Sequence, residues 1–487
     1  MNSRKSPLLI ALAAILTLSS CSGLKNACTT NCGSGDALIS ITMSDTPPTN
    51  TSVVSFTLPV IGVALVPSSG SQAQVFSSGN FELTRLQSDT SLVVTNVKVA
   101  AGSYTAVNVT VSAPSGVYVN SSTNTYGTCL PQEICSITGA ATTITYTFPT
   151  ALTLSANAKQ WVNLDFNYNN AIVTTKNVVG IDMTQTGVMT ASSTVPTGVS
   201  SGNFANIDDF TGQIMALSSG SITVTSKLRG SVTATINSAT QWFDPQSQCT
   251  GGGSITCVQT GSVVSLQGLL STSGVVNATS VDVIDKNPSP ADEVEGMIYP
   301  SLCNGAGSYG MILSDTVINT SGSPLTGSTF GSGVCLTIGG TALFGVDTGI
   351  LTGQSGAPTG TKVPGFAGTG DLIAGQTVRA QITGAATGTN GYINATATEM
   401  LLRFSRLTGT VSTASSNSFS ITNLPPYLGT TFTVPPTVIT YPNATLLENV
   451  ASSSVGNLSG TVSMNTLYLN VSGGAQYWFQ AAKVRQQ

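Results

Sequence analysis

Residues 210–226 read FTGQIMALSSGSITVTS, and this stretch decides the fold class. Apolar and β-branched residues stand on both sides of a Ser-Gly pair, which is the pattern of two short strands joined by a turn. Thr, Val and Ile recur along the whole chain, with Gly and Asn as turn formers between them. Charged residues are only 7% of the 487 residues, fewer than helical surfaces normally carry. The sequence therefore predicts an all-β protein whose outward strand faces are neutral Ser, Thr and Asn.

The same opening recurs twice, as VEGMIYP from Val294 and as LTGTVSTASSNSFSITN from Leu407, each with a glycine between strand-like residues. Similar closing segments begin at Gly261 and Gly375. The period is roughly 80 to 115 residues, which indicates repeated domains and excludes solenoid turns. The units resemble an uncharacterised family of small β-barrel modules of exported bacterial proteins. This resemblance implies barrels in series, comparable with OB-like or SH3-like modules.

Three earlier stretches share a different pattern: ISITMSDTPP (39–48), VKVAAGSYTAVNVTV (97–111) and WVNLDFNYNNAIV (161–173). In this order they resemble the strands of an uncharacterised bacterial lipoprotein domain family, a domain of unknown function. The resemblance covers about residues 37–190 and implies a transthyretin-like or immunoglobulin-like β-sandwich, without implying any chemistry.

Three residues of this region could be functional or structural. Asp45 precedes Pro47 and Pro48, so we interpret its carboxylate as a turn former, with a calcium ligand as the alternative. Tyr104 and Trp161 are interpreted as core or corner aromatics in preference to ligand platforms.

The N-terminus predicts export and lipidation. Arg4 and Lys5 precede an apolar run over residues 8–18, which ends in Leu-Ser-Ser before Cys21. This resembles a bacterial lipobox and implies that Cys21 is lipidated and becomes the mature N-terminus. An ordinary secretory signal is the alternative. Because Ser22 follows where inner-membrane lipoproteins often carry Asp, we expect the protein to be anchored in the outer membrane.

These patterns give a domain map. It comprises a lipoprotein signal peptide (1–20), a lipidated tether (21–36), a β-sandwich (37–190), a linker (191–206) and β-modules 1 (207–290), 2 (291–404, with a long insertion) and 3 (405–487). We expect the modules to fold independently.

The cysteines after Cys21 fit an oxidising compartment and local pairing. The candidate disulfide cysteines form the neighbouring couples Cys28 with Cys32, Cys129 with Cys135, Cys249 with Cys257, and Cys303 with Cys335. A zinc site is not expected, because histidine is absent and no two couples have the C-x-x-C form.

The sequence predicts no catalytic residue, metal or cofactor. Without histidine, Ser-His-Asp and Cys-His mechanisms are excluded. Carboxylates remain as candidates for glycosidase or calcium chemistry, namely Asp208, Asp209, Asp282, Asp285, Asp292, Glu293 and Glu295. In a chain with so few charges we expect these carboxylates to be solvated, in turns and at domain boundaries.

Net charge is −4 and no basic block follows the signal peptide, so nucleic acid is not an expected partner. We predict a non-catalytic cell-envelope lipoprotein that acts in surface binding, adhesion or scaffolding. Its partners would be the membrane, through the lipid anchor, and a glycan, peptide or envelope protein. The alternative is a carboxylate-dependent enzyme acting on polysaccharide, or its accessory binding subunit.

Overall fold

The computed structural model describes residues 35–487 except 47–48, 176, 304–306, 359, 389–390, 429–431, 433 and 472–475. The predicted lipidation site Cys21 and the couple Cys28 with Cys32 lie outside the described residues. The all-β prediction is confirmed, since the described chain contains thirty strands and one short α-helix, α1 (Tyr168–Ala171). Among the described residues no helix has the length and apolar character that crossing a membrane requires.

The N-terminal part forms two sheets around one core. The first sheet has the order β13 (Met189–Ser192), β10 (Lys159–Phe166), β1 (Asp36–Asp45), β5 (Ser91–Ala100). The second has the order β8 (Ile134–Thr138), β7 (Ser115–Val119), β2 (Val53–Pro67), β6 (Gly102–Val111), β9 (Thr142–Leu154), and β3 (Ala73–Phe76) and β4 (Gly79–Glu82) also pair with β2. The hairpin of β11 (Ile172–Thr175) and β12 (Val178–Ile181) forms a separate two-stranded sheet, whose Val179 and Ile181 pack in the same core. Inward side chains of both sheets pack together as one apolar cluster, which makes this region a sandwich.

The remainder of the chain forms three rings of five strands. Ring 1 runs β14 (Asn203–Ser218), β15 (Ser221–Ser226), β16 (Gly230–Thr235), β19 (Val276–Asp285), β18 (Val263–Ser271). Ring 2, a closed barrel, runs β20 (Asp292–Ile298), β21 (Ser308–Val317), β22 (Gly333–Val346), β24 (Ile393–Arg403), β23 (Thr377–Thr387). Ring 3 runs β25 (Ser405–Ala414), β26 (Ser418–Thr422), β27 (Thr437–Thr440), β30 (Gln476–Gln486), β29 (Thr461–Val471).

Counted in chain order, the third and fifth strands of each ring pair in parallel and the first strand pairs with the second and fourth, so all three rings share one topology. The short strands β17 (Gln241–Phe243) and β28 (Leu446–Glu448) add to the last strands of rings 1 and 3. Short 3₁₀ helices occupy connections: η1 (Pro300–Leu302), η2 (Pro324–Gly327), η3 (Gly349–Leu351), η4 (Thr369–Asp371), η5 (Pro426–Leu428), η6 (Ala451–Ser453) and η7 (Val455–Asn457). The repeat seen in the sequence is therefore a repeat of strand order.

A glycine marks the same place in every ring. A Cβ on Gly212 would lie 2.3 Å from the Thr225 carbonyl oxygen, and one on Gly296 would lie 2.2 Å from the Ile312 carbonyl oxygen. In ring 3 a Cβ on Gly409 would meet the neighbouring strand β26 in the same way. Each glycine lies where the opening strand passes very close to the second strand, so a side chain there has no room.

Three disulfides link described cysteines as the sequence predicts. They join Cys129 to Cys135, Cys249 to Cys257, and Cys303 to Cys335. The first two close short loops, whereas the third ties the segment after η1 to β22.

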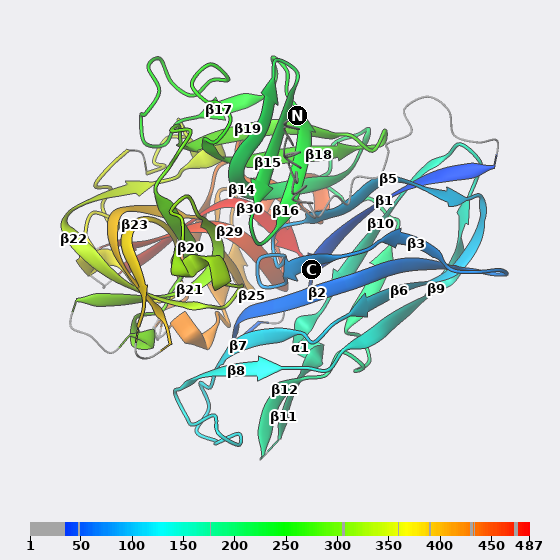
Figure 1. Ribbon diagram of the computed structural model, residues 1–487, viewed down its shortest axis with the longest axis horizontal. Coiled ribbons are helices and arrows are strands. Elements are labelled where there is room, and N and C mark those ends of the chain that lie inside the picture. The colour runs from blue at the N-terminus through cyan, green and yellow to red at the C-terminus, as the bar shows by residue number, and fades with distance from the viewer. Residues whose placement is uncertain are drawn as a thin grey trace, which may run out of the picture.

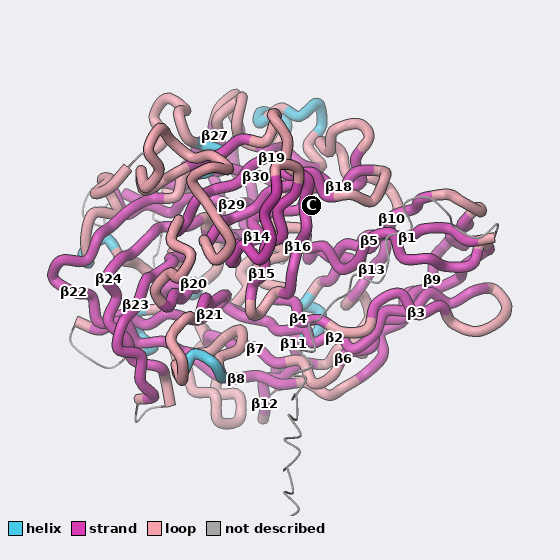
Figure 2. Tube along the Cα trace, turned by 45° about the horizontal axis from the view of Figure 1, so that its top comes forward, coloured by secondary structure: helices cyan, strands magenta, loops and turns pink. Residues whose placement is uncertain are grey.

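The rings gather beside one end of the sandwich, with β30 of ring 3 near the middle of the molecule (Figures 1 and 2). Between Ser192, where the sandwich ends, and Asn203, where β14 begins, the chain is largely exposed. One hydrogen bond holds this connection to ring 3, from the Asn449 backbone N–H to the Thr197 carbonyl oxygen. The predicted linker over 191–206 thus overlaps the ends of two strands.

Candidate functional site

The carboxylates proposed from the sequence are not solvated, so that expectation is wrong. All seven are buried and lie on strands β14, β19 and β20: Asp208, Asp209, Asp282, Asp285, Asp292, Glu293 and Glu295. Four of them have ion-pair partners from other elements: Asp209, Glu293 and Glu295 pair with arginines, and Asp208 pairs with Lys483. Because a buried charge is costly unless it is paired, the burial itself indicates a specific arrangement.

The rings and the sandwich share one buried ion-pair cluster, which we call the charged hub. It consists of Arg85, Asp89, Asp209, Glu293, Glu295, Asp347, Arg379, Arg403 and Arg406. Its side chains are at most 6% exposed. Asp209 alone contacts three arginines, with 3.2 Å to Arg85, 2.6 Å to Arg403 and a close contact to Arg406. Charges of ring 1, ring 2, ring 3 and the sandwich therefore neutralise one another at a single place.

The sandwich reaches the hub through one loop, residues 83–90, which follows β4. Arg85 of this loop donates to Glu295 of ring 2 over 2.9 Å and to Asp209 of ring 1 over 3.2 Å. Gln87 accepts a hydrogen bond of 3.1 Å from the Thr408 hydroxyl of ring 3. This loop, which we call the insertion loop, is therefore bound to all three rings.

A second cluster lies between rings 1 and 3. Lys483 of β30 donates to Asp208 of β14 over 2.7 Å and lies 3.0 Å from Glu448 of β28. Arg485 donates to the same Glu448 oxygen over 2.7 Å. We call these four residues the lysine cluster.

Burial and neighbouring charges set the protonation of these groups in opposite directions. Burial alone would raise the pKa of Glu295, but Arg85, Arg403 and Arg379 outweigh it and lower the pKa to about 2. Asp282 has no such surplus of cations, so burial raises its pKa to about 7. Burial also raises the pKa of Asp208, against the opposing effect of Lys483.

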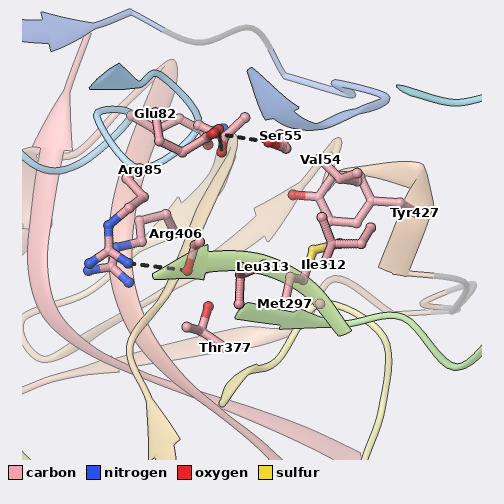
Figure 3. Close-up of a pocket in the computed structure, with 14 residues that line it drawn as sticks. Val54, Ser55, Glu82, Arg85, Met297, Ile312, Leu313, Thr377, Arg406 and Tyr427 are labelled. Atoms are coloured by element: carbon pink, nitrogen blue, oxygen red, sulfur yellow. Dashed lines mark hydrogen bonds between the residues drawn. The ribbon is translucent and has the colours of Figure 1, made fainter. Parts of the chain in front are cut away.

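A small cavity borders the hub on the side of the insertion loop and ring 2 (Figure 3). Its volume is about 50 Å³, which suits water molecules and is far below that of organic ligand sites. Arg85 and Arg406 lie at one side of it, whereas Met297, Ile312 and Tyr427 lie at the other.

A larger pocket of about 380 Å³ lies between rings 1 and 3, and the lysine cluster reaches its floor. Its buried floor includes Asn206, Asp208 and Lys483, and Asn206 Nδ2 has no hydrogen-bond partner among the described residues. The exposed rim includes Ser200 and Asn443. The volume falls within the range of small-molecule sites, and its polar lining consists mostly of amides and hydroxyls.

Of the other predicted carboxylates, Asp285 and Asp292 accept hydrogen bonds from groups of the protein itself, whereas Asp282 Oδ1 has no partner among the described residues. The Asp292 carboxylate accepts backbone N–H groups of Asn319 and Thr320 at 2.7 and 2.8 Å. Asp285 accepts from the Gln381 amide over 3.1 Å. In the described part of the chain, no group of three or more Cys, Asp or Glu side chains is placed to hold a metal ion.

The sandwich residues singled out from the sequence have structural roles. Asp45 is buried and accepts the Tyr168 backbone N–H over 3.2 Å, a bond between segments distant in sequence and not the local bond of a turn. The Tyr104 hydroxyl donates to the Ala100 carbonyl over 2.8 Å, and Trp161 is a buried core residue. The neighbouring Pro47 and Pro48 lie outside the described residues.

Sequence reasoning missed the cations that hold these carboxylates. Arg403 and Arg406 stand in the apolar run MLLRFSRLTG, where strand residues on both sides are buried. A lone arginine inside such a run indicates a buried ion pair, so the sequence could have predicted the burial of these two arginines. Arg85 and Lys483 offer no comparable local signal.

Comparison with known proteins bears on the sandwich alone. A search among curated proteins found no match to the chain. Residues 36–181, from β1 to β12, match the family described as domain of unknown function (DUF4382), so the N-terminal sandwich is similar to this family over all of its strands except β13.

Proposed function

We propose that the chain is a non-catalytic lipoprotein of the bacterial cell envelope, and that it binds a neutral glycan in the pocket between rings 1 and 3. The pocket of about 380 Å³ is the observation that carries the proposal. Hydroxyl-rich ligands are bound by amide and hydroxyl groups, which Asn206, Gln267 and Asn443 supply here. Small β-barrel modules of this kind often bind oligosaccharides, which agrees with the site.

The state of the carboxylates supports binding over catalysis. Asp209 is held by three arginines, and Asp208 is held by Lys483, so neither has a free oxygen pair for attack. Asp282, whose pKa of about 7 suits a general acid, is not one of the residues that line the pocket. The alternative, a carboxylate-dependent polysaccharide-acting enzyme, therefore has less support.

A glycan array followed by calorimetry tests the proposal. The protein should bind at least one neutral glycan, and Asn443→Ala and Gln267→Ala should each weaken binding by about 10-fold, the cost of one lost hydrogen bond. Thr233→Ala, on the exposed face of β16, is the matched control and should leave affinity unchanged. Binding that is absent from the array, or that ignores both pocket variants, would refute the proposal.

The lipid anchor and the cellular location are proposed from the sequence. We expect Cys21→Ser to remove the lipid anchor and move the protein from the detergent phase to the aqueous phase in phase partitioning. Equal partitioning of the two proteins would contradict lipidation at Cys21. Fractionation of the envelope would then test the proposed outer-membrane location.

A further inference from the structure

Lys483 is placed unusually for a buried lysine. Its Nζ lies 2.7 Å from Asp208 Oδ2 and 3.0 Å from Glu448 Oε2. The side chain is only 4% exposed, and those of its two partners are at most 10% exposed. An amine and two carboxyl groups therefore meet in one buried place. Against the effect of burial, Arg485 and Lys483 lower the pKa of Glu448 to about 2, so this second carboxylate is ionised and can act as a base.

The choice of lysine sets this position apart from the charged hub. Every cation of the hub is an arginine, and so is the fourth member of the lysine cluster, Arg485. An arginine stays charged and pairs with carboxylates through a planar fork, so it is the better residue for a purely ionic contact. A lysine differs in that its amine, once deprotonated, is a nucleophile.

We propose that Lys483 and Asp208 join in an intramolecular isopeptide bond. Lys483 Nζ attacks Asp208 Cγ, a C–N bond forms and the C–O bond to one carboxyl oxygen breaks. One ammonium proton first moves to the Asp208 carboxylate, and a second leaves the nitrogen during attack, relayed by the Glu448 carboxylate 3.0 Å away. The carboxyl oxygen departs with these two protons as one water. The step conserves oxidation state and needs no co-reactant.

The surroundings of Asp208 favour this step. Burial raises the pKa of its carboxyl group, which favours the protonated form whose hydroxyl can leave. The Thr90 backbone N–H donates to Asp208 Oδ2 over 3.0 Å and stabilises negative charge on that oxygen during attack. Asp208 and Lys483 both line the larger pocket, which gives the released water a way out.

The bond would connect distant parts of the chain. Asp208 lies on the first strand of ring 1 and Lys483 on the last strand of ring 3, 275 residues apart in sequence. The three rings would be closed into one covalent loop, and a neutral amide would replace two charges on the pocket floor. The proposal does not depend on glycan binding, because it concerns the floor of the pocket and needs no ligand.

Intact mass spectrometry of the reduced protein tests the bond, with Lys483→Arg as the matched variant. The variant keeps the positive charge but lacks the amine, and unknown N-terminal processing is the same in both proteins. The wild type should be lighter than the variant by the Lys-to-Arg difference plus one water. A difference equal to the Lys-to-Arg change alone would overturn the proposal.

A second measurement needs no variant. Tryptic digestion of the denatured wild type should yield one branched peptide that contains both Asp208 and Lys483, with no cleavage after Lys483. Recovery of both residues only in separate linear peptides would overturn the bond. In Glu448→Gln the branched fraction should fall, and an unchanged fraction would refute Glu448 as the proton carrier.

Discussion

At the residue scale, this chain places most of its chemistry in the interior. Thr and Ser form the exposed face of the first ring, where the hydroxyls of Thr223 and Thr233 lie 2.9 Å apart across β15 and β16. Arginines and carboxylates, which normally keep proteins soluble at their surface, are used inside instead. The chain therefore has few charged residues, and it uses many of them in buried ion pairs instead of on its surface.

The need for a glycine at the same position of each ring can be tested at Gly212. In Gly212→Ala the new Cβ would overlap the Thr225 carbonyl oxygen of β15, so β14 and β15 must separate. We expect a loss of about 1–3 kcal/mol in the free energy of unfolding, measured in urea. Gly220→Ala is the control, because a Cβ there meets no atom within 4 Å. Equal stability of the two variants would show that the close approach is unimportant.

The raised pKa of Asp282 predicts a pH dependence of stability. The folded-state pKa is about 7 and the ordinary value is 3.8, so the folded protein binds the proton more tightly than the unfolded chain. The stability that Asp282 contributes is thus complete below pH 3.8 and is lost as pH rises through about 7. Asp282→Asn cannot ionise, so its urea midpoint should rise relative to wild type between pH of about 4 and about 8. A difference in urea midpoint between the two proteins that stays constant with pH would contradict the prediction.

At the element scale, the insertion loop carries the polar contacts of the sandwich to the hub. Its Leu83 and Leu86 pack in the sandwich core, while its Arg85 and Gln87 reach the meeting point of the rings. Apolar residues of β2 and β7 also pack against rings 2 and 3. Partners from other elements satisfy the Thr90 backbone N–H and the Asp89 carboxylate of this loop, as burial of a loop requires, whereas Arg85 Nε has no partner among the described residues.

The disulfides predict different losses of stability according to the loops they close. Cys303 and Cys335 are 32 residues apart, whereas Cys129 and Cys135 are 6 apart. In the chain-entropy model, removing the longer link by double Cys→Ala substitution should cost about 4 kcal/mol, and removing the shorter one about 2 kcal/mol. Urea unfolding without reductant measures both. A larger loss for the shorter link would contradict this ranking.

At the scale of the whole molecule, the four units share one polar centre. The sequence predicts independent modules, but ion pairs of the hub cross every predicted boundary between them. An isolated unit would leave part of these charges exposed to solvent or without a partner. We therefore expect the whole described region to unfold in urea in a single transition.

A substitution of Arg85 tests whether the hub couples the unfolding of the four units. Arg85→Met removes one cation from both Asp209 and Glu295 and leaves buried charge without its full compensation. We expect a loss of about 3–5 kcal/mol in the free energy of unfolding. Lys98→Met, on the exposed edge of β5, is the control and should change stability little. If Arg85→Met had the same free energy of unfolding as Lys98→Met, the hub would not hold the units together.

The sequence by itself determined the features that depend on neighbouring residues. The strand class follows from composition, the three ring openings from the pattern around Gly212, Gly296 and Gly409, and the disulfide Cys129–Cys135 from its short spacing. Each of these signals lies within a few residues or in a repeat, where local conformational preference and pattern carry the information.

Only the tertiary structure decided where the charges lie. Asp209 reads as a turn carboxylate in the sequence, and its partners Arg85 and Arg403 are 124 and 194 residues away. Whether a carboxylate is solvated or buried depends on which strands meet around it, and that is set by the packing of rings and sandwich together. For the same reason the pocket and the lysine cluster, built from the first strand of ring 1 and the last strand of ring 3, left no trace in any local pattern.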